Sequence, residues 1–155
     1  NVTYSENALN NDFYGVYYGQ AALPMPSEQI KYMTWDGMKD IQVYDYESGQ
    51  PVPIGLYDYK AAEGMDPYEF YLYGSKSLIT IENPNGQAGE AIIFRDSFGS
   101  SIAPLLAQGY QKITLVDIRY ISPSMLDKFI DFKDKDIIFL YSTTVLNNSV
   151  GQFVK

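Results

Sequence analysis

The sequence predicts an α/β fold whose C-terminal half is a parallel, doubly wound β-α-β-α-β core. Three short apolar runs, each typical of a buried strand, alternate there with two helix-like segments, and the connections between them are short. Such crossovers are right-handed, so the strands are expected to be parallel. The first half is rich in tyrosine, glycine and proline and predicts an irregular, hairpin-rich portion packed on the core. We expect one domain over residues 1–155, with portions 1–87 and 88–155.

The C-terminal strands are predicted over residues 91–94, 112–118 and 137–141. A helix is expected over residues 98–110, although Pro104 inside it predicts a kink or a late start. Its expected apolar residues are Ile102, Leu105 and Leu106.

The second helix is expected to begin at Ser122 as N-cap and Pro123 as first residue. Its predicted apolar face consists of Met125, Leu126, Phe129 and Ile130.

The N-terminal half gives weaker signals. Residues 41–46 and 54–57 predict the two strands of a hairpin, and residues 78–81 predict a strand that ends at the turn 83–86. A short helix is expected over residues 26–32, started by Ser27.

Composition excludes several classes of function. The net charge of −8 argues against binding to nucleic acid or to an anionic membrane surface. The chain has no cysteine and no histidine, so a zinc site is not expected, and there is no glycine-rich phosphate loop. No apolar stretch is long enough to span a bilayer. We therefore expect no metal, no cofactor and no membrane insertion.

The segment most suited to chemistry is the loop 94–101, between the first C-terminal strand and the helix. In doubly wound sheets, ligands bind at the carboxyl ends of the strands, which here are residues 95–97, 117–120 and 142–144. Ser97 would lie at such an end and at a helix N-terminus, where free amides can stabilise an oxyanion. Asp and Ser are also the preferred N-cap residues, so spacing alone favours a capping role for Ser97. Only the last glycine of a G-x-S-x-G elbow is present, as Gly99.

A longer pattern changes this interpretation. It consists of residues 93–99 (Ile-Phe-Arg-Asp-Ser-Phe-Gly), Pro104, Tyr110, Ile113 and residues 116–120 (Val-Asp-Ile-Arg-Tyr). It resembles the DHHW family of bacterial proteins, which belongs with the SGNH-like polysaccharide O-acetyltransferases of the alginate-acetylation type. Residues 13–18 and 56–58 are also similar to that family.

The resemblance implies an SGNH- or flavodoxin-like core and a serine esterase or O-acetyltransferase that acts on bacterial, extracytoplasmic, cell-surface polysaccharide. Ser97 would be the nucleophile, and Asp96 would help to shape its turn. The related enzymes take their base from an Asp-x-His-Trp motif upstream of the serine. Because this chain has no histidine, we expect it to be the C-terminal part of a longer protein, with the missing upstream segment as its partner and little activity alone.

The residues expected to bind the acylated substrate surround the turn and the end of the second strand: Arg95, Gly99, Asp117, Arg119 and Tyr120. Arg119 could bind a carboxylate or polarise a substrate oxygen. A purely structural pairing of Arg119 with Asp117 or with the backbone is at least as well supported.

Two alternatives remain open. The chain could be a non-catalytic carbohydrate-binding or surface-interaction module in which Tyr17, Tyr18, Tyr57 and Tyr71 stack on sugars. It could also be a structural remnant with an open sheet edge or apolar patch, through which it would dimerise.

Overall fold

The computed structural model describes residues 2–9, 12–15 and 24–148. Its largest element is a six-stranded mixed sheet in the order β4-β3-β5-β7-β6-β8. The strands of this sheet are β3 (Gln42–Asp45), β4 (Val52–Ile54), β5 (Leu78–Glu82), β6 (Ala88–Arg95), β7 (Tyr110–Val116) and β8 (Asp136–Leu140). The other elements are β1 (Tyr4–Ala8), β2 (Lys31–Trp35), η1 (Met38–Asp40), η2 (Ala61–Glu63), η3 (Pro67–Phe70), α2 (Gly99–Leu106), η4 (Pro123–Lys128) and α3 (Thr143–Asn148).

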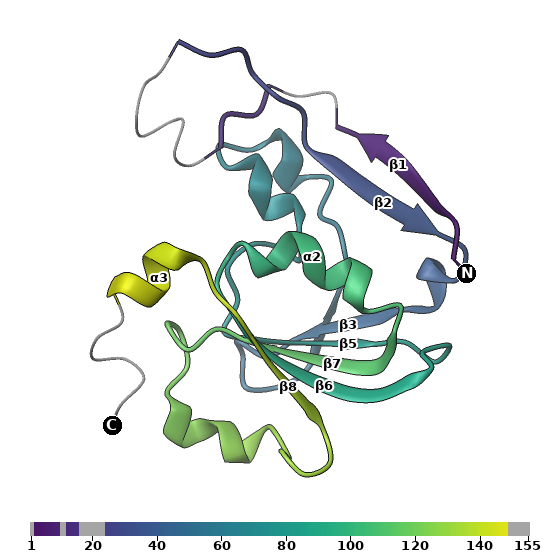
Figure 1. The fold of residues 1–155 in the computed structure, drawn as a ribbon, viewed down its shortest axis with the longest axis vertical. Coiled ribbons are helices and arrows are strands. Elements are labelled where there is room, and N and C mark those ends of the chain that lie inside the picture. The colour runs from purple at the N-terminus through teal and green to yellow at the C-terminus, as the bar shows by residue number, and fades with distance from the viewer. Residues whose placement is uncertain (1, 10–11, 16–23, 149–155) are drawn as a thin grey trace.

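The three C-terminal strands form the parallel part of the sheet, as the sequence predicts. β6 lies between β7 and β8 and pairs in parallel with both. The residues of β6 alternate between the two faces: Ile93 packs in the larger apolar cluster with Ala103 of α2, and Ile92 packs in the smaller one with Leu126 of η4. α2 and η4 therefore cover opposite faces of the sheet (Figure 1).

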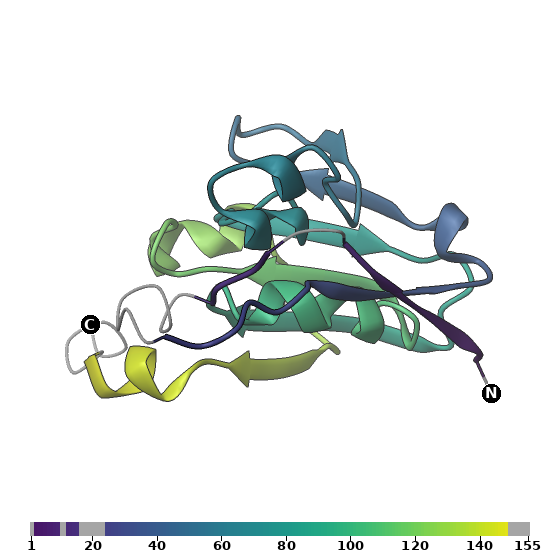
Figure 2. The same cartoon turned by 90° about the horizontal axis from the view of Figure 1, so that it is seen from above.

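The N-terminal half extends this sheet, although the sequence led us to expect it to pack on the core. β5 runs antiparallel to β7, and β3 runs antiparallel to both β5 and β4. The expected hairpin is present as β3 and β4 and forms the edge of the sheet opposite to β8 (Figure 2). Its second strand was expected over residues 54–57 but lies at Val52–Ile54. The parallel arrangement is thus limited to β6, β7 and β8.

The helix expected over residues 26–32 is wrong. Residues Lys31–Trp35 instead form β2, which pairs antiparallel with β1. The hydroxyl of Ser27 does not cap a helix and donates a hydrogen bond to the carboxylate of Asp12. The aromatic side chains of this segment suit a strand, and pairing with a partner far along the chain outweighs the weak capping signal at Ser27.

Both crossover helices differ in detail from the sequence prediction. α2 ends at Leu106 and buries the small residues Ala103 and Pro104, whereas Ile102 is 41% exposed. η4 is a 3-10 helix; Pro123 is in its first turn as expected, but Ser122 makes no side-chain cap. Leu126 and Ile130 are buried, and Met125 and Phe129 remain exposed. None of the helices in the described part of the chain has the length and apolar character needed to cross a bilayer.

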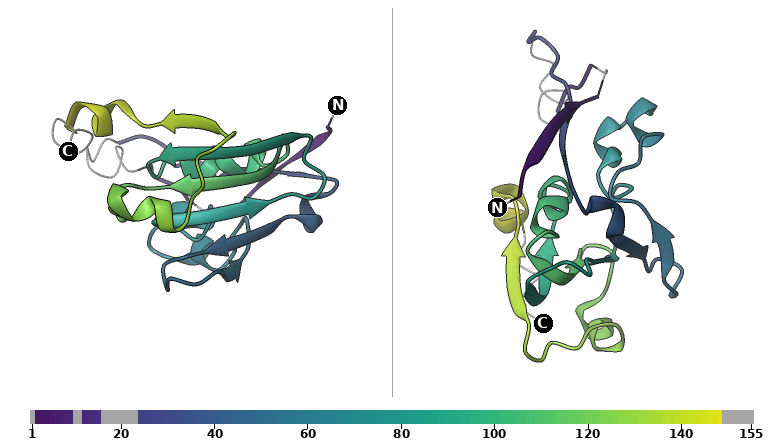
Figure 3. Two further views of the ribbon diagram at one scale, coloured as in Figure 1. Left: turned by 90° about the horizontal axis from the view of Figure 1, so that it is seen from below. Right: turned by 90° about the vertical axis from the view of Figure 1, so that its right-hand side faces the viewer.

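The outer side of β8 is an apolar sheet edge. Within the described ranges, β8 pairs only with β6, and Ile137 and Phe139 are 47% and 66% exposed. The Phe139 ring stacks on Phe94 with centroids 5.0 Å apart. Soluble proteins protect such edges with charges, prolines or covering segments. Apart from Asp136 at its start, β8 is apolar, and among the described residues it is the last strand on its side of the sheet (Figure 3).

A cluster of aromatic rings joins β2 to the main sheet. Tyr57 and Phe70 stack with centroids 4.9 Å apart, and both are buried. The hydroxyls of Tyr57 and Tyr71 donate to the carbonyls of Met33 and Lys31, at 2.8 and 2.6 Å. These two tyrosines belong to the core, which corrects their expected role in stacking on sugars; Tyr17 and Tyr18 lie outside the described residues.

We expect the Tyr71 hydroxyl to make folding sensitive to alkali. Burial raises the pKa of Tyr71 to about 12, above its ordinary value of 10.0. Because the folded state holds this proton more tightly, the stabilising contribution is complete below pH 10 and is lost as pH rises toward 12. The free energy of unfolding, measured with urea at pH 8 and pH 11, should therefore fall less in Tyr71→Phe than in the wild type. An equal fall in both proteins would contradict this assignment.

Candidate active site at the carboxyl ends of the parallel strands

The carboxyl ends of β6 and β8 meet at the residue before Ser97. Asp96 follows β6 directly, and its Oδ2 accepts a 2.7 Å hydrogen bond from the amide of Ser142, which follows β8. Asp117 follows β7, and its charge acts on the buried Arg95. The structure thus brings together the three strand ends that the sequence singled out.

Asp96 shapes the turn that presents Ser97. Its other carboxylate oxygen, Oδ1, accepts a 3.0 Å hydrogen bond from the amide of Phe98, and its side chain is almost fully buried. Both oxygens are therefore bonded to backbone amides of the fold. Asp96 acts as a positioning residue for the turn, and its carboxylate is not directed at the Ser97 hydroxyl.

Ser97 is the partly exposed residue of this turn. Within the described part of the chain, its hydroxyl makes no hydrogen bond. The amides of Gly99 and Ser100 donate to the carbonyls of Asp96 and Ser97, at 3.1 and 3.0 Å. The amide of Phe98 donates to Asp96 as well, so the amides of Phe98, Gly99 and Ser100 are all bonded within the turn and are not free for an oxyanion. The amide of Ser97 is the remaining donor of the turn.

Arg95 lies beneath the turn and is fully buried. Its Nη1 donates to the Asp96 carbonyl at 3.3 Å and to the Ser100 hydroxyl at 3.1 Å. Nε and Nη2 are enclosed and have no hydrogen-bond partner among the described residues. Burial lowers the pKa of Arg95, while the negative charge of Asp117 opposes that change. Solvent does not reach Arg95, so its side chain supports the turn from beneath, and a direct contact with the substrate stays a prediction.

Gly99 allows α2 to start directly above Arg95. A Cβ at this position would lie 2.7 Å from the Cβ of Arg95 and 3.2 Å from its Cγ. The last glycine of the expected elbow is therefore required for packing against a buried side chain.

Asp117 and Arg119 form a two-pronged ion pair at the end of β7. Arg119 Nη2 and Nε donate to the two carboxylate oxygens of Asp117, at 2.6 and 2.9 Å. Asp117 is fully buried, whereas Arg119 is partly exposed, and its guanidinium lies 5.4 Å from the ring centre of the exposed Tyr120. This hydrogen bonding raises the pKa of Arg119. The structural pairing with Asp117 is present, and Arg119 and Tyr120 remain accessible to a substrate.

The site also includes two tyrosines, Tyr68 and Tyr141, that the sequence did not indicate. The hydroxyl of Tyr68 donates to the Ser101 hydroxyl at 3.1 Å, and so joins η3 to the start of α2. Tyr141 lies at the end of β8, where burial raises its pKa to about 12 and the charges of Asp117 and Asp96 act in the same direction. Tyr68 carries no local signal for this role because its contact depends on residues more than 30 positions away.

No metal site accompanies these residues. Among the described residues, no group of three or more acidic side chains is placed to hold a metal ion.

The chain is similar to solved structures. No protein-family profile and no curated protein matches the chain. A DHHW family protein from Eubacterium siraeum has a TM-score of 0.67 at 19% identity, over 92% of this chain and 49% of its own. Bacillus cereus PatB1 gives a TM-score of 0.63 with a sulfonyl adduct and 0.59 in a second structure, both at 23% identity.

The chain has a DHHW- and PatB1-like fold. It covers 48% and 50% of the two PatB1 chains, so it spans about half the length of these solved structures. The family resemblance drawn from residues 93–120 is supported at the level of the fold.

We expect Asp96→Ala to destabilise the protein by about 3 kcal/mol, because it removes two hydrogen bonds between a buried carboxylate and the backbone. Asp131→Ala is the matched control. Asp131 accepts a 3.0 Å bond from the amide of Lys133 in the same local geometry, but it is exposed, so its loss should cost less than about 1 kcal/mol. Urea unfolding of both variants measures the difference, and equal losses would show that the Ser142 link contributes nothing.

Gly99→Ala should destabilise the protein by about 1–3 kcal/mol, since the added methyl group overlaps Arg95. Gly89→Ala, where an added Cβ meets nothing within 4 Å, should change stability by no more than about 0.5 kcal/mol. Thermal unfolding of the two variants checks this, and a Gly99→Ala protein as stable as Gly89→Ala would exclude the close contact.

Proposed function

We propose that this chain carries the nucleophile of an SGNH-like serine esterase or O-acetyltransferase that acts on polysaccharide. One observation carries the proposal: the turn holds the Ser97 hydroxyl partly exposed and without a hydrogen bond in the described structure, while Arg95, Asp96 and Gly99 beneath it are buried. A serine placed between the carboxyl end of a parallel strand and the N-terminus of a helix suits nucleophilic catalysis.

In the proposed reaction, Ser97 Oγ attacks the carbonyl carbon of an acyl donor, and a base takes the hydroxyl proton. The Ser97 amide donates to the oxyanion. The base returns this proton to the donor's leaving alcohol, and an acyl-Ser97 ester remains. A sugar hydroxyl or water then attacks this ester and gives its proton to the base. The acyl group passes to the incoming oxygen, and the base returns the proton to Ser97 Oγ. Arg119 and Tyr120 lie where they would contact the substrate.

We infer that the base comes from a segment outside these 155 residues. The chain has no histidine, and the carboxylate of Asp96 is occupied by the Phe98 and Ser142 amides. Two observations support a further segment that completes the site. The chain spans about half of the PatB1 and DHHW structures, and the open apolar edge of β8 ends beside Asp96. We expect the histidine-bearing segment to dock there.

The PatB1 structure with a sulfonyl adduct suggests a chemical probe. Sulfonyl and phosphonyl fluorides react with nucleophilic hydroxyls and mimic the acyl donor. Polysaccharide as the acyl acceptor, and a location outside the cytoplasm of a bacterium, are inferred from the DHHW-like pattern of residues 93–120 and from the fold.

We expect a fluorophosphonate to label Ser97 once the upstream segment is present. Intact-mass spectrometry should show one adduct on a version extended upstream and none on residues 1–155 alone. Ser97→Ala should abolish the adduct, whereas Ser101→Ala should retain it, because the Ser101 hydroxyl is bonded to Phe98 and Tyr68. Labelling in neither length of the protein would refute Ser97 as the nucleophile.

A non-catalytic carbohydrate-binding module is the second candidate, and the absence of histidine favours it. This function predicts that glycan binding survives Ser97→Ala and that no acyl-enzyme forms in either length of the protein.

A further inference from the structure

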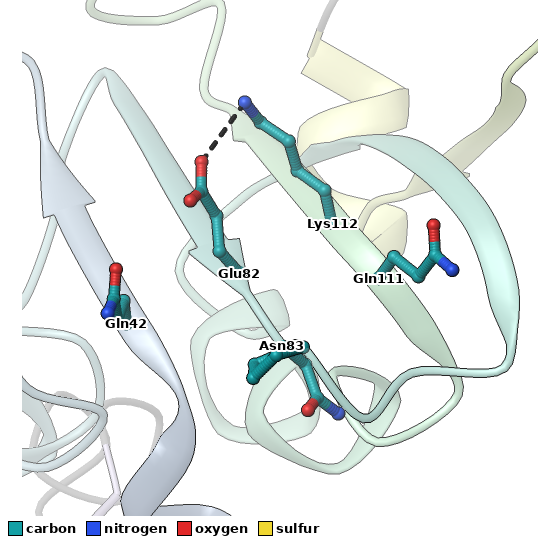
Figure 4. Close-up of a pocket in the computed structure, with 6 residues that line it drawn as sticks. Gln42, Glu82, Asn83, Gln111 and Lys112 are labelled. Carbon is teal, nitrogen blue, oxygen red and sulfur yellow. Dashed lines mark ion pairs between the residues drawn. The ribbon is translucent and has the colours of Figure 1, made fainter.

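A polar hollow lies at the end of the sheet opposite to Ser97. Its volume is about 340 Å³, and we call it the Trp35 hollow; its main lining residues are Trp35, Asp36, Asn83, Asn85, Gln87 and Gln108. A second hollow of about 440 Å³ shares Asn83 with it, and its lining includes Gln42, Glu82, Gln111 and Lys112 (Figure 4). The two hollows flank the turn that joins β5 to β6.

The Trp35 hollow is far from the candidate active site. Gln87 immediately precedes β6 and Asp96 immediately follows it, and the eight residues of this strand span about 25 Å. The start of β1 and α3 likewise lie toward opposite ends of the molecule (Figure 3, left). A ligand in the hollow would therefore occupy a site separate from Ser97.

The indole ring of Trp35 is held in place from β1. Tyr4 pairs with Trp35 in the two-stranded sheet, and the rings meet edge to face with centroids 5.8 Å apart. The Tyr4 hydroxyl donates to Gln108 Oε1 at 2.9 Å, which fixes this sheet to the segment after α2. Trp35 is half-buried and packs in part against the larger apolar cluster.

Several polar groups of the hollow are not used by the fold. Asn83 and Asn85 are occupied, since their side-chain amides donate to the Ala107 carbonyl and to Asp40. By contrast, the side chains of Asp36 and Gln87 are exposed and make no hydrogen bond within the described ranges. Gln108 Nε2 also has no partner there, but it is enclosed and does not face a ligand. The accessible wall thus offers the Gln87 amide and the Asp36 carboxylate beside an aromatic ring.

This combination fits a neutral saccharide. An indole stacks on the apolar face of a sugar ring, and carboxylate and amide groups bond to its hydroxyls. An anionic ligand is disfavoured because Asp36 is acidic, no Lys or Arg lines this hollow, and the net charge is −8. In the second hollow, Lys112 is already paired with Glu82 at 3.2 Å. We propose that the Trp35 hollow binds a neutral oligosaccharide, independently of the chemistry at Ser97.

The test uses Trp35 as its own reporter, because it is the single tryptophan of the chain. Its fluorescence is titrated with cellohexaose, mannohexaose and chitohexaose, three neutral hexasaccharides, and the affinity is measured separately by calorimetry. We expect a saturable change with at least one of them. No saturable change and no heat with all three would overturn the proposal.

Surface variants decide where the sugar binds. Asp36→Ala and Gln87→Ala should each weaken binding about fivefold, the effect of one lost hydrogen bond. Gln50→Ala, an exposed glutamine on the distant β3–β4 turn, should leave affinity unchanged. Ser97→Ala should also bind normally, which keeps this site distinct from the proposed active site. Binding unaffected by both Asp36→Ala and Gln87→Ala would place the sugar elsewhere and refute the assignment.

Discussion

The buried carboxylate of Asp96 connects the two parts of the molecule on which the candidate site depends. One oxygen accepts the Phe98 amide and fixes the turn around Ser97, and the other accepts the Ser142 amide and fixes the end of β8. A carboxylate that is removed from water needs such partners, because an unpaired charge in the interior is costly. The position of Ser97 relative to the strand ends therefore follows from how one side chain satisfies its hydrogen bonds.

The charged groups around Asp96 are buried beneath the site, whereas the residues above them are accessible to solvent. Arg95 and Asp117 are fully buried at the ends of neighbouring strands, and Arg119 reaches from Asp117 toward solvent. A buried ion network contributes little net stability, but it fixes geometry, since each group has few alternative partners. Arg95 keeps two nitrogens without a partner among the described residues. The network holds the floor of the site, and Ser97, Arg119 and Tyr120 form its accessible surface.

Much of this arrangement could be predicted from the sequence, and the failures have identifiable causes. The apolar runs located β6, β7 and β8, and the carboxyl-end rule brought Asp96 and Ser142 to one place. Residues 26–32 were misjudged because β2 depends on pairing with β1, which no local pattern encodes. The burial of Arg95 was not foreseen because arginine is normally exposed. The sequence also could not show that the amides of Phe98, Gly99 and Ser100 are bonded within the turn, because this depends on the three-dimensional path of the backbone.

The claim that Asp96 couples the Ser97 turn to β8 can be tested at the amides themselves. Hydrogen exchange measured by NMR should show strong protection at Ser142 and Phe98 in the wild-type chain, although both lie outside strands and helices. In Asp96→Asn, one of the two acceptor oxygens is replaced by a donor, so at least one of these amides should exchange much faster while the centre of β6 stays protected. Rapid exchange at both amides in the wild-type chain would contradict the account.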